Sequence, residues 1–269
     1  MDEMEDELVY FISMLKNERY QKILSRLELD QTITVKDMAE LCSVKEDCIR
    51  KDLSALEKQG KLKRIHGGAT LIEEARNPML YSAESRMDLH YEQKAAIARK
   101  AVLLIPEHST VFLDISTITL EIAKQIVLND LDITVVTNMA SMIPVFRQPS
   151  RASFIMIGGK MNRAEDGFVG SLADQQISRF HFDLGFFGAV GVSPADGAVT
   201  TYEMEDALTK SCALKQCARK ILIFEKEKLH QQGNSDYSSL EDFDFLITDP
   251  DLPKKEKSSL EKYTAVKQA

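Results

Sequence analysis

The stretch from Ile33 to Thr70, ITVKDMAELCSVKEDCIRKDLSALEKQGKLKRIHGGAT, decides the fold of the N-terminal part of this chain. Thr34 is suited to an N-cap, and apolar residues recur at helical spacing from Val35 to Leu41, which predicts a first helix. A turn at Cys42-Ser43 separates it from a second predicted helix, which we expect to end at Gly60. The apolar stripe of this second helix consists of Val44, Cys48, Ile49, Leu53 and Leu56.

The second helix is predicted to read DNA. When its apolar stripe turns inward, Lys45, Arg50, Lys51 and Ser54 are left toward solvent. A helix that presents such residues fits the major groove, with its N-terminal half nearest the base edges. The segment LKRIHGGA that follows adds a basic strand and a Gly-Gly turn, as a wing along the phosphates needs. A mixed-charge helix alone is more often a solvated face, but the adjoining wing favours a DNA-binding module.

Charge is distributed unevenly along the chain. The whole sequence is acidic, with a net charge of −8 and a sequence pI of about 5.3, which argues against a protein that coats nucleic acid without specificity. Residues 1–10 hold five carboxylates and no cation, whereas residues 45–66 hold seven Lys or Arg against four Asp or Glu. Cationic surface is therefore expected mainly on the predicted reading helix and wing.

Length and composition limit the class of protein further. The 269 residues suffice for a small DNA-binding head and one larger domain. No apolar run approaches the length of a membrane span and the N-terminus is too acidic for a signal peptide, so we expect a cytoplasmic protein with no membrane partner. We expect reduced thiols and no metal site, because metal-ligand spacing is lacking among the four cysteines, which are Cys42, Cys48, Cys212 and Cys217. No cofactor is expected either.

The expected domain organisation has four parts. Residues 1–17 form an N-terminal extension with a short amphipathic helix, residues 18–73 the DNA-binding domain, residues 74–92 a polar linker, and residues 93–269 a second domain. The extension's apolar helical face would consist of Leu8, Phe11, Ile12 and Leu15.

The second domain alternates short apolar strands, such as TVFLD, ITVVTN and FLITD, with helical stretches, the first of them from Lys94 to Leu104. Continuous apolar strands separated by helices imply a mainly parallel sheet that is covered on both faces. The expected fold class is therefore α/β, with a winged helix-turn-helix in front of a parallel α/β domain. Several strands end in small or hydroxylated residues, and ligands of such sheets bind beyond the carboxyl ends of the strands.

The loop DISTIT, residues 114–119, follows one of these strands and opens a helix. The free N–H groups and the dipole of a helix N-terminus favour an anion, and Ser116, Thr117 and Thr119 add hydroxyl donors, so that a phosphate would fit. Ser and Thr also cap helices that bind no ligand at all. Lys210 and Lys228 could supply counter-charge, although each alone is more often a surface lysine.

The order of RYQKIL, VKDMAELCSV, IRKDLSALEKQGKLKR and HGGA resembles the N-terminal winged helix of DeoR-family bacterial transcription regulators, over roughly Glu18 to Glu73. The family usually has Ser where Lys45 stands, Thr where Cys48 stands, and Arg where Lys51 stands. Loss of a Ser cap costs about 1 kcal/mol of helix stability, and Lys cannot read a base or phosphate in bidentate fashion. The predicted DNA-binding residues are Thr34, Lys45, Arg50, Lys51, Ser54, Lys63, Arg64, His66, Gly67 and Gly68.

The second half resembles the DeoR-family effector domain, which shares its fold with ribose-5-phosphate isomerase, from roughly Leu80 to Asp249 through FLDISTITLEIA, VVTN, IGGK, FVGSLA, FFGAVGV and FLITD. This resemblance implies a site for a phosphorylated sugar or a related metabolite. Here Ile115 and Ile118 interrupt the small and hydroxylated residues of the family's phosphate loop. The predicted effector-binding residues are Asp114, Ser116, Thr117, Thr119, Thr137, Asn138, Gly158, Gly159, Lys210 and Lys228.

Two classes of function are compatible with the sequence. In the first, a non-enzymatic regulator, most simply a repressor of carbohydrate metabolism genes, binds a double-stranded operator as a homodimer or homotetramer, and an effector shifts it between two arrangements. In the second, a sugar-phosphate isomerase-like enzyme uses Glu203 or Glu205 as its base. The fused DNA-binding head favours the first, and we expect no catalytic residues.

Overall fold

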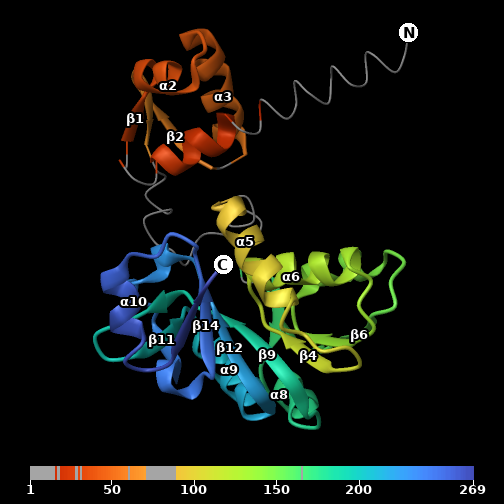
Figure 1. The fold of residues 1–269 in the computed structure, drawn as a ribbon. Coiled ribbons are helices and arrows are strands. Elements are labelled where there is room, and N and C mark those ends of the chain that lie inside the picture. Colours follow the sequence, from red (N-terminus) through yellow and green to blue (C-terminus); the bar gives the residue numbers. More distant parts are fainter. Residues whose placement is uncertain are drawn as a thin grey trace. The chain divides into compact units, whose positions relative to one another are not determined.

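A computed structural model describes residues 16, 19–27, 30, 32–59, 61–70, 89–164 and 166–269. The chain divides into two compact units, Met1–Leu89 and His90–Ala269, which we call the head and the C-terminal unit (Figure 1). Apart from Lys16, the predicted N-terminal extension lies outside the described residues, as does the predicted linker before its last four positions.

The head is a small helical bundle with a three-stranded antiparallel sheet. Residues 19–27 are helical, and the later elements are β1 (Thr32–Thr34), α2 (Val35–Cys42), α3 (Glu46–Lys58), β2 (Lys63–Ile65) and β3 (Gly68–Thr70). The strands lie in the order β1-β3-β2. The predicted helix-turn-helix is confirmed, and the wing gains a strand, β1, that the sequence did not reveal.

Local interactions explain where these elements begin and turn. The Thr34 side chain accepts a hydrogen bond from the N–H of Asp37 at 3.1 Å, so it caps α2 as predicted. Ser43 adopts a left-handed conformation (φ 54°) and ends α2. Gly68 lies beneath β1, because a Cβ at that position would sit 1.9 Å from the carbonyl oxygen of Ile33.

The head's core joins the three helices with β1 and β3, whereas the side chains of β2 are exposed. Its fully buried side chains come from the helix of residues 19–27, from α2 and α3, and from the segment before β2. They include Ile23, Leu27, Met38, Ile49, Leu53, Leu56 and Leu62. A charged contact reinforces the core: Arg19 donates to both carboxylate oxygens of Asp52, at 2.7 and 3.1 Å. This pair attaches α3 to the helix of residues 19–27.

The C-terminal unit is built on a seven-stranded sheet in the order β15-β14-β12-β9-β4-β5-β6, and every pairing in it is parallel. This confirms the predicted mainly parallel sheet, although the last strand was not predicted. In chain order the strands are β4 (Thr110–Leu113), β5 (Thr134–Thr137), β6 (Ser153–Met156), β9 (Phe182–Gly188), β12 (Cys217–Ile223), β14 (Phe245–Thr248) and β15 (Ala265–Gln268).

Helices cover both faces of this sheet. The helices α8 (Ser171–Ile177), α9 (Met204–Lys215) and α10 (Lys254–Leu260) share one core cluster with Phe112 and Leu222 of the sheet. Neighbouring strand residues point to the opposite face, on which α5 (Tyr91–Val102) and α6 (Thr117–Leu128) lie together (Figure 1). The helix α5 begins at Tyr91, inside the range 74–92 that was predicted as linker.

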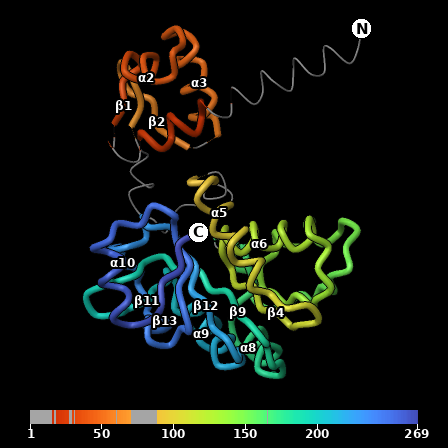
Figure 2. Tube along the Cα trace, viewed as in Figure 1, coloured from red at the N-terminus to blue at the C-terminus, as the bar shows by residue number. Residues whose placement is uncertain are grey.

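Smaller elements complete the unit. The strands β10 (Gly191–Val192), β11 (Ala198–Thr201) and β13 (Ser235–Ser239) form an antiparallel sheet, and β7 (Lys160–Asn162) pairs with β8 (Gly167–Val169) as a hairpin. Short helical segments are η3 (Ala140–Met142), α7 (Ile143–Phe146), η4 (Lys226–Lys228) and η5 (Leu240–Asp242). The last strand, β15, pairs with β14, and Figure 2 marks the C-terminus that follows it. Among the described helices, none combines the length and apolarity needed to cross a bilayer.

Candidate functional site

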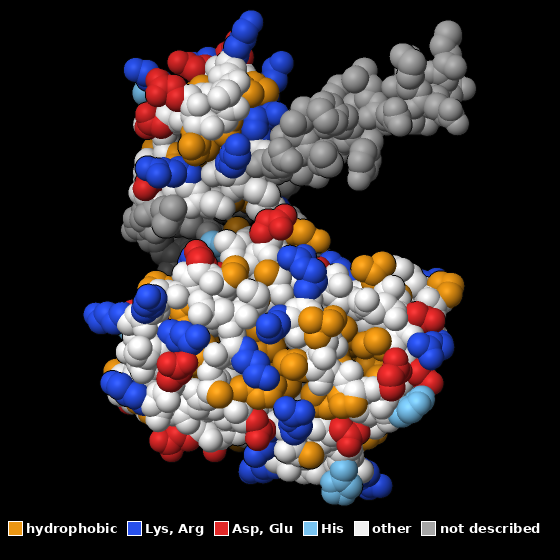
Figure 3. Space-filling view, in the orientation of Figure 1, with side chains coloured by type: hydrophobic (Ala, Val, Ile, Leu, Met, Phe, Trp, Pro, Cys, Tyr) orange, Lys and Arg blue, Asp and Glu red, His pale blue; other side chains and the backbone are white. Residues whose placement is uncertain are grey.

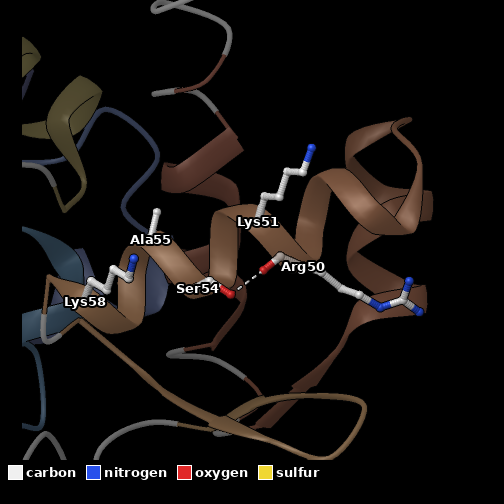
Figure 4. A pocket seen from close by; sticks show the side chains of 5 residues that line it. All are labelled: Arg50, Lys51, Ser54, Ala55 and Lys58. Atoms are coloured by element: carbon white, nitrogen blue, oxygen red, sulfur yellow. Dashed lines mark hydrogen bonds between the residues drawn. The ribbon is translucent and has the colours of Figure 1, made fainter.

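The outer face of α3 forms a shallow cationic groove. Ile49, Leu53 and Leu56 are fully buried, whereas Lys45, Arg50 and Lys51 are exposed, as the apolar stripe predicted. The groove is lined by Arg50, Lys51, Ser54, Ala55 and Lys58. Figure 4 shows that Lys51 and Ser54 leave the helix on different sides, while the Arg50 side chain extends away from Lys58.

Arg50 is held by its own helix. Its guanidinium donates to Glu46 Oε2 at 2.6 Å and to Asp47 Oδ1 at 2.7 Å, both in the first turn of α3. The side chains remain open to water, at 50% exposure for Arg50, 49% for Glu46 and 83% for Asp47. Exposed ion pairs of this kind contribute about 0–1 kcal/mol, so Arg50 can exchange these partners for a nucleic-acid group.

The start of α3 is held without a side-chain cap. Lys45 occupies the N-cap position with extended backbone, and its side chain makes no capping hydrogen bond. A second hollow lies there, and the residues around it include Lys36, Glu40, Ser43, Lys45, Glu46 and Cys48. Without a Ser at the cap, the N-terminal turn of α3 depends on Glu46 and Asp47, whose charge suits a helix N-terminus.

The wing presents three exposed basic side chains, Lys63, Arg64 and His66. Gly67 has a φ of 79°, which favours glycine, and its carbonyl accepts from the N–H of Val35 at 2.8 Å. Arg64 Nη1 donates to Ser54 Oγ at 2.9 Å, and Ser54 Oγ donates to the carbonyl of Arg50 at 2.9 Å. The wing cation and the groove of α3 therefore form one continuous surface.

Lys58, Ala55 and Glu57 belong to this surface but were absent from the residues predicted on sequence grounds. Lys58 and Ala55 line the groove, and their helical spacing from Lys51 was a signal that could have found them. Glu57 Oε1 accepts from the backbone N–H of Arg64 at 2.8 Å. That contact crosses a turn, so no spacing rule reveals it.

In the C-terminal unit, Asp114 and Lys210 form a buried ion pair. The exposed fractions of their side chains are 1% and 4%. Asp114 Oδ2 also accepts from the N–H of Gly188 at 3.1 Å, and Asp206 Oδ2 lies 3.8 Å from Lys210 Nζ. Burial raises the pKa of Asp114, although Lys210 and Gly188 act to lower it. The structure thus brings together two predicted site residues that are 96 positions apart.

The loop after β4 leads from this pair into α6. Ser116 is the N-cap, and its Oγ accepts from the N–H of Ile118 at 3.2 Å. Thr119 Oγ1 donates to the carbonyls of Asp114 and Ser116 at 2.6 and 2.7 Å. Ser116 and Thr117 are half-buried, whereas Thr119 is fully buried. The hydroxyls of Ser116 and Thr119 therefore stabilise the loop, whereas Ser116 and Thr117 are the hydroxyl residues of this loop that reach the surface.

Ile115 takes part in packing around this loop. It is 7% exposed, and a Cβ on Gly167 would lie 2.2 Å from its Cδ1 atom. Gly167 belongs to the β7–β8 hairpin, whose backbone also bonds to Asn138, since the N–H of Phe168 donates to the Asn138 carbonyl at 2.8 Å. Within the described residues, the buried Asn138 Oδ1 has no hydrogen-bond partner.

The other predicted effector residues lie at neighbouring strand ends. Thr137 is fully buried, and its Oγ1 accepts from the N–H of Met139 at 3.1 Å. Gly158 and Gly159 are half-buried, and Gly158 bonds in both directions with the Gln176 side chain, at 3.3 and 2.8 Å.

Lys228 lies beside a different acid from the one paired with Lys210. Glu225 follows β12 and is buried, and Lys94 Nζ of α5 lies 3.6 Å from its Oε1 atom. Although burial opposes it, the cations of Lys94 and Lys228 hold the pKa of Glu225 below its usual value. Lys228 therefore compensates the charge of Glu225.

Glu203 and Glu205, the two candidate bases of the enzyme hypothesis, both contact the β7–β8 hairpin. Glu205 Oε2 accepts from Lys160 Nζ at 2.7 Å, and Glu203 Oε2 accepts from Asn162 Nδ2 at 3.0 Å. They fasten the hairpin to the start of α9, and this geometry gives no support to proton abstraction by either.

The four cysteines are free thiols; Cys217 is buried and the other three are half-buried. Among the residues that the structure describes, no cluster of His, Cys, Asp and Glu is arranged to hold a metal ion.

A winged helix-turn-helix joined to a parallel α/β unit defines a class of DNA-binding regulators, and comparison with known proteins identifies the family. A sequence model of the DeoR-like helix-turn-helix domain matches residues 19–75, and one of the DeoR C terminal sensor domain matches residues 89–250. The chain therefore belongs to the DeoR family of transcriptional regulators.

Similar relatives include the lactose phosphotransferase system repressor of Staphylococcus epidermidis, which is 30% identical over 94% of this chain and 99% of its own length. The HTH-type transcriptional repressor GlcR of Bacillus subtilis is 31% identical over 88% of this chain and 89% of its own. Ribose 5-phosphate isomerase A from Methanocaldococcus jannaschii overlaps 52% of this chain and 54% of its own, at 11% identity and a TM-score of 0.39, a likeness too weak to inform function.

Proposed function

We propose that this chain represses genes of carbohydrate metabolism by binding an operator with α3 and the wing. The observation that carries the proposal is the continuous cationic surface in which Arg64 of the wing bonds to Ser54 inside the groove of α3. Arg50 and Lys51 supply groups that can reach base edges, and Lys58, Lys63 and His66 supply groups for phosphates. The gene class is proposed because the similar lactose phosphotransferase system repressor is named for a sugar.

The second part of the proposal concerns the effector. A phosphorylated sugar or related metabolite binds at the start of α6, where Ser116 and Thr117 are reachable from solvent and the helix N-terminus favours an anion. The Asp114–Lys210 pair, Asn138 and the two glycines of IGGK surround its remaining part. To alter DNA binding, the ligand must bind one arrangement of the protein better than another, with a differential of about 1–3 kcal/mol.

The regulator acts as a homo-oligomer, a dimer or a tetramer, assembled through its C-terminal unit. Large apolar side chains exposed on α8 and α9 support this, since Leu172, Met204 and Leu208 are 64%, 63% and 57% exposed. Figure 3 shows hydrophobic side chains on the visible surface of the same unit. Two heads on repeated half-sites would multiply a modest single-site affinity.

The test begins with selection of a preferred duplex from random DNA, followed by gel shifts of that duplex with sugar phosphates present. We expect a preferred sequence and at least one sugar phosphate that shifts the dissociation constant, without being chemically converted. A chain that binds all sequences equally would refute operator recognition. Conversion of the sugar phosphate into product would favour the enzyme hypothesis instead.

A further inference from the structure

Two contacts fasten the wing strand β2 to α3. Glu57 Oε1 accepts from the backbone N–H of Arg64 at 2.8 Å, and Ser54 Oγ accepts from the Arg64 guanidinium at 2.9 Å. Glu57 and Ser54 lie three positions apart and so share one side of α3. Residues of α3 therefore hold both the main chain and the side chain of Arg64.

The contact between Glu57 and the Arg64 N–H lies at the edge of β2 that pairs with no other strand of this sheet. β2 is an edge strand of the head's sheet, and Arg64 stands opposite Ala69 of β3. The Arg64 N–H bonds to Glu57 of α3, away from β3, at an edge where a strand normally leaves such groups to solvent. A carboxylate is a strong acceptor for a backbone N–H, so Glu57 anchors this edge to the helix.

The negative charge of Glu57 separates two effects that its removal would have on DNA binding. The carboxylate is exposed, precedes Lys58 in the chain and contacts the backbone of Arg64, on a surface that has to approach phosphates. Affinity for DNA of any sequence rises with the cations that neutralise phosphate and falls with acids placed among them. On charge alone, removal of Glu57 should tighten binding to every duplex, whereas loss of an anchor should loosen binding only where the wing must be in register.

We propose that Glu57 is a positioning residue for DNA recognition: it holds the wing against α3, so that Arg64 meets the duplex in a fixed register with Arg50 and Lys51. The inference rests on the proposed operator binding. Glu57 contacts no DNA itself and acts through Arg64, and its effect is on the ratio of operator affinity to random-sequence affinity.

The experiment compares three variants of the full chain with the wild type, on the selected operator and on random duplex. Glu57→Ala removes charge and anchor. Glu57→Gln removes the charge but keeps an oxygen that can accept from Arg64. Glu40→Ala is the matched control, since Glu40 is an exposed carboxylate on α2 beside Lys45. We expect Glu57→Ala to lower the affinity ratio about three- to tenfold, as one hydrogen bond can, while Glu57→Gln and Glu40→Ala preserve it.

A double-variant comparison separates positioning from a general loss of structure. If Glu57 acts through Arg64, Glu57→Ala should lower the ratio no further in an Arg64→Ala chain, whereas a damaged head would lower it again and would also abolish binding to random duplex. Either an additive loss or an unchanged ratio for Glu57→Ala overturns the inference. A wild-type chain without any preferred duplex overturns the proposed function as well, so the two failures are distinguishable.

Discussion

Replacing Arg50 with alanine tests the proposed reading of DNA most directly. In the free protein its guanidinium is bound to Glu46 and Asp47 at 2.6 and 2.7 Å. Because all three side chains are well exposed, leaving these partners costs about 0–1 kcal/mol. A bidentate contact between arginine and a base contributes about 1–3 kcal/mol of discrimination. The net loss in Arg50→Ala should be about 1–2 kcal/mol per head, or about 5- to 30-fold in operator affinity.

The assay measures dissociation constants for the operator and for random duplex at several salt concentrations. Arg50→Ala should weaken operator binding by the factor above and random binding by less than about threefold, with an unchanged dependence on salt. Lys58→Ala, at the other end of the same groove, is the comparison variant. It should weaken both duplexes similarly and lower the salt slope by about 1.

Equal losses on both duplexes for Arg50→Ala, together with a smaller salt slope, would refute the reasoning. Arg50 would then touch phosphate only, and sequence would be read by Lys51, by the wing or by the shape of the duplex. A loss below about twofold on both would mean that the Glu46 and Asp47 contacts keep Arg50 away from DNA.

Three further outcomes are expected. Asp52→Asn should lower the free energy of unfolding of the head, measured by urea denaturation, by about 2–3 kcal/mol. The loss is smaller than for a fully buried ion pair because Arg19 keeps 18% side-chain exposure. An unchanged midpoint of urea unfolding would contradict this. Ser116→Ala should bind operator normally but respond weakly to an effective sugar phosphate in gel shifts, and a wild-type response would remove Ser116 from the site. Burial raises the pKa of the Cys217 thiol to about 12, so iodoacetamide at pH 8 should label Cys217 far more slowly than half-buried Cys48; equal labelling rates would show that Cys217 is accessible.

The helices of the head followed from the sequence because their apolar stripes are strong and long. The cap at Thr34 and the burial of Ile49, Leu53 and Leu56 agree with that prediction. The strand β1 did not follow, because three residues, TIT, carry too little alternation to predict a strand. Its pairing with β3 depends on Gly68, which lets the two backbones approach.

In the C-terminal unit, buried apolar runs predicted the parallel strands, whereas β7, β8, β10 and β13 are short or polar and form antiparallel pieces at the strand ends. β15 was missed for a related reason, since AVKQ alternates weakly and becomes a strand by pairing with β14. Such elements are specified by tertiary contacts that a local pattern does not contain.

The site could be predicted only as far as local patterns reach. The outward direction of Arg50 and Lys51 followed from the helical stripe, and the strand-end rule placed Asp114 near later elements. The contact of Asp114 with Lys210 crosses 96 positions, and that of Arg19 with Asp52 crosses 33. The burial of Asp114, Thr119 and Lys210 was likewise invisible, because hydroxyl and charged residues are expected at a surface.

The buried Asp114–Lys210 pair also bears on where an effector can bind. A ligand that took Lys210 from Asp114 would leave a buried carboxylate without its cation, at a cost of about 3–5 kcal/mol that would weaken the ligand's own binding. A phosphate at half-buried Ser116 and Thr117 leaves the pair intact. Phosphate binding at Ser116 and Thr117 is therefore favoured over phosphate binding at Lys210. For the same reason Lys210→Ala is a poor probe of the effector site, because it leaves the Asp114 carboxylate without its cation and destabilises the unit, whereas Ser116→Ala removes one hydroxyl at the surface.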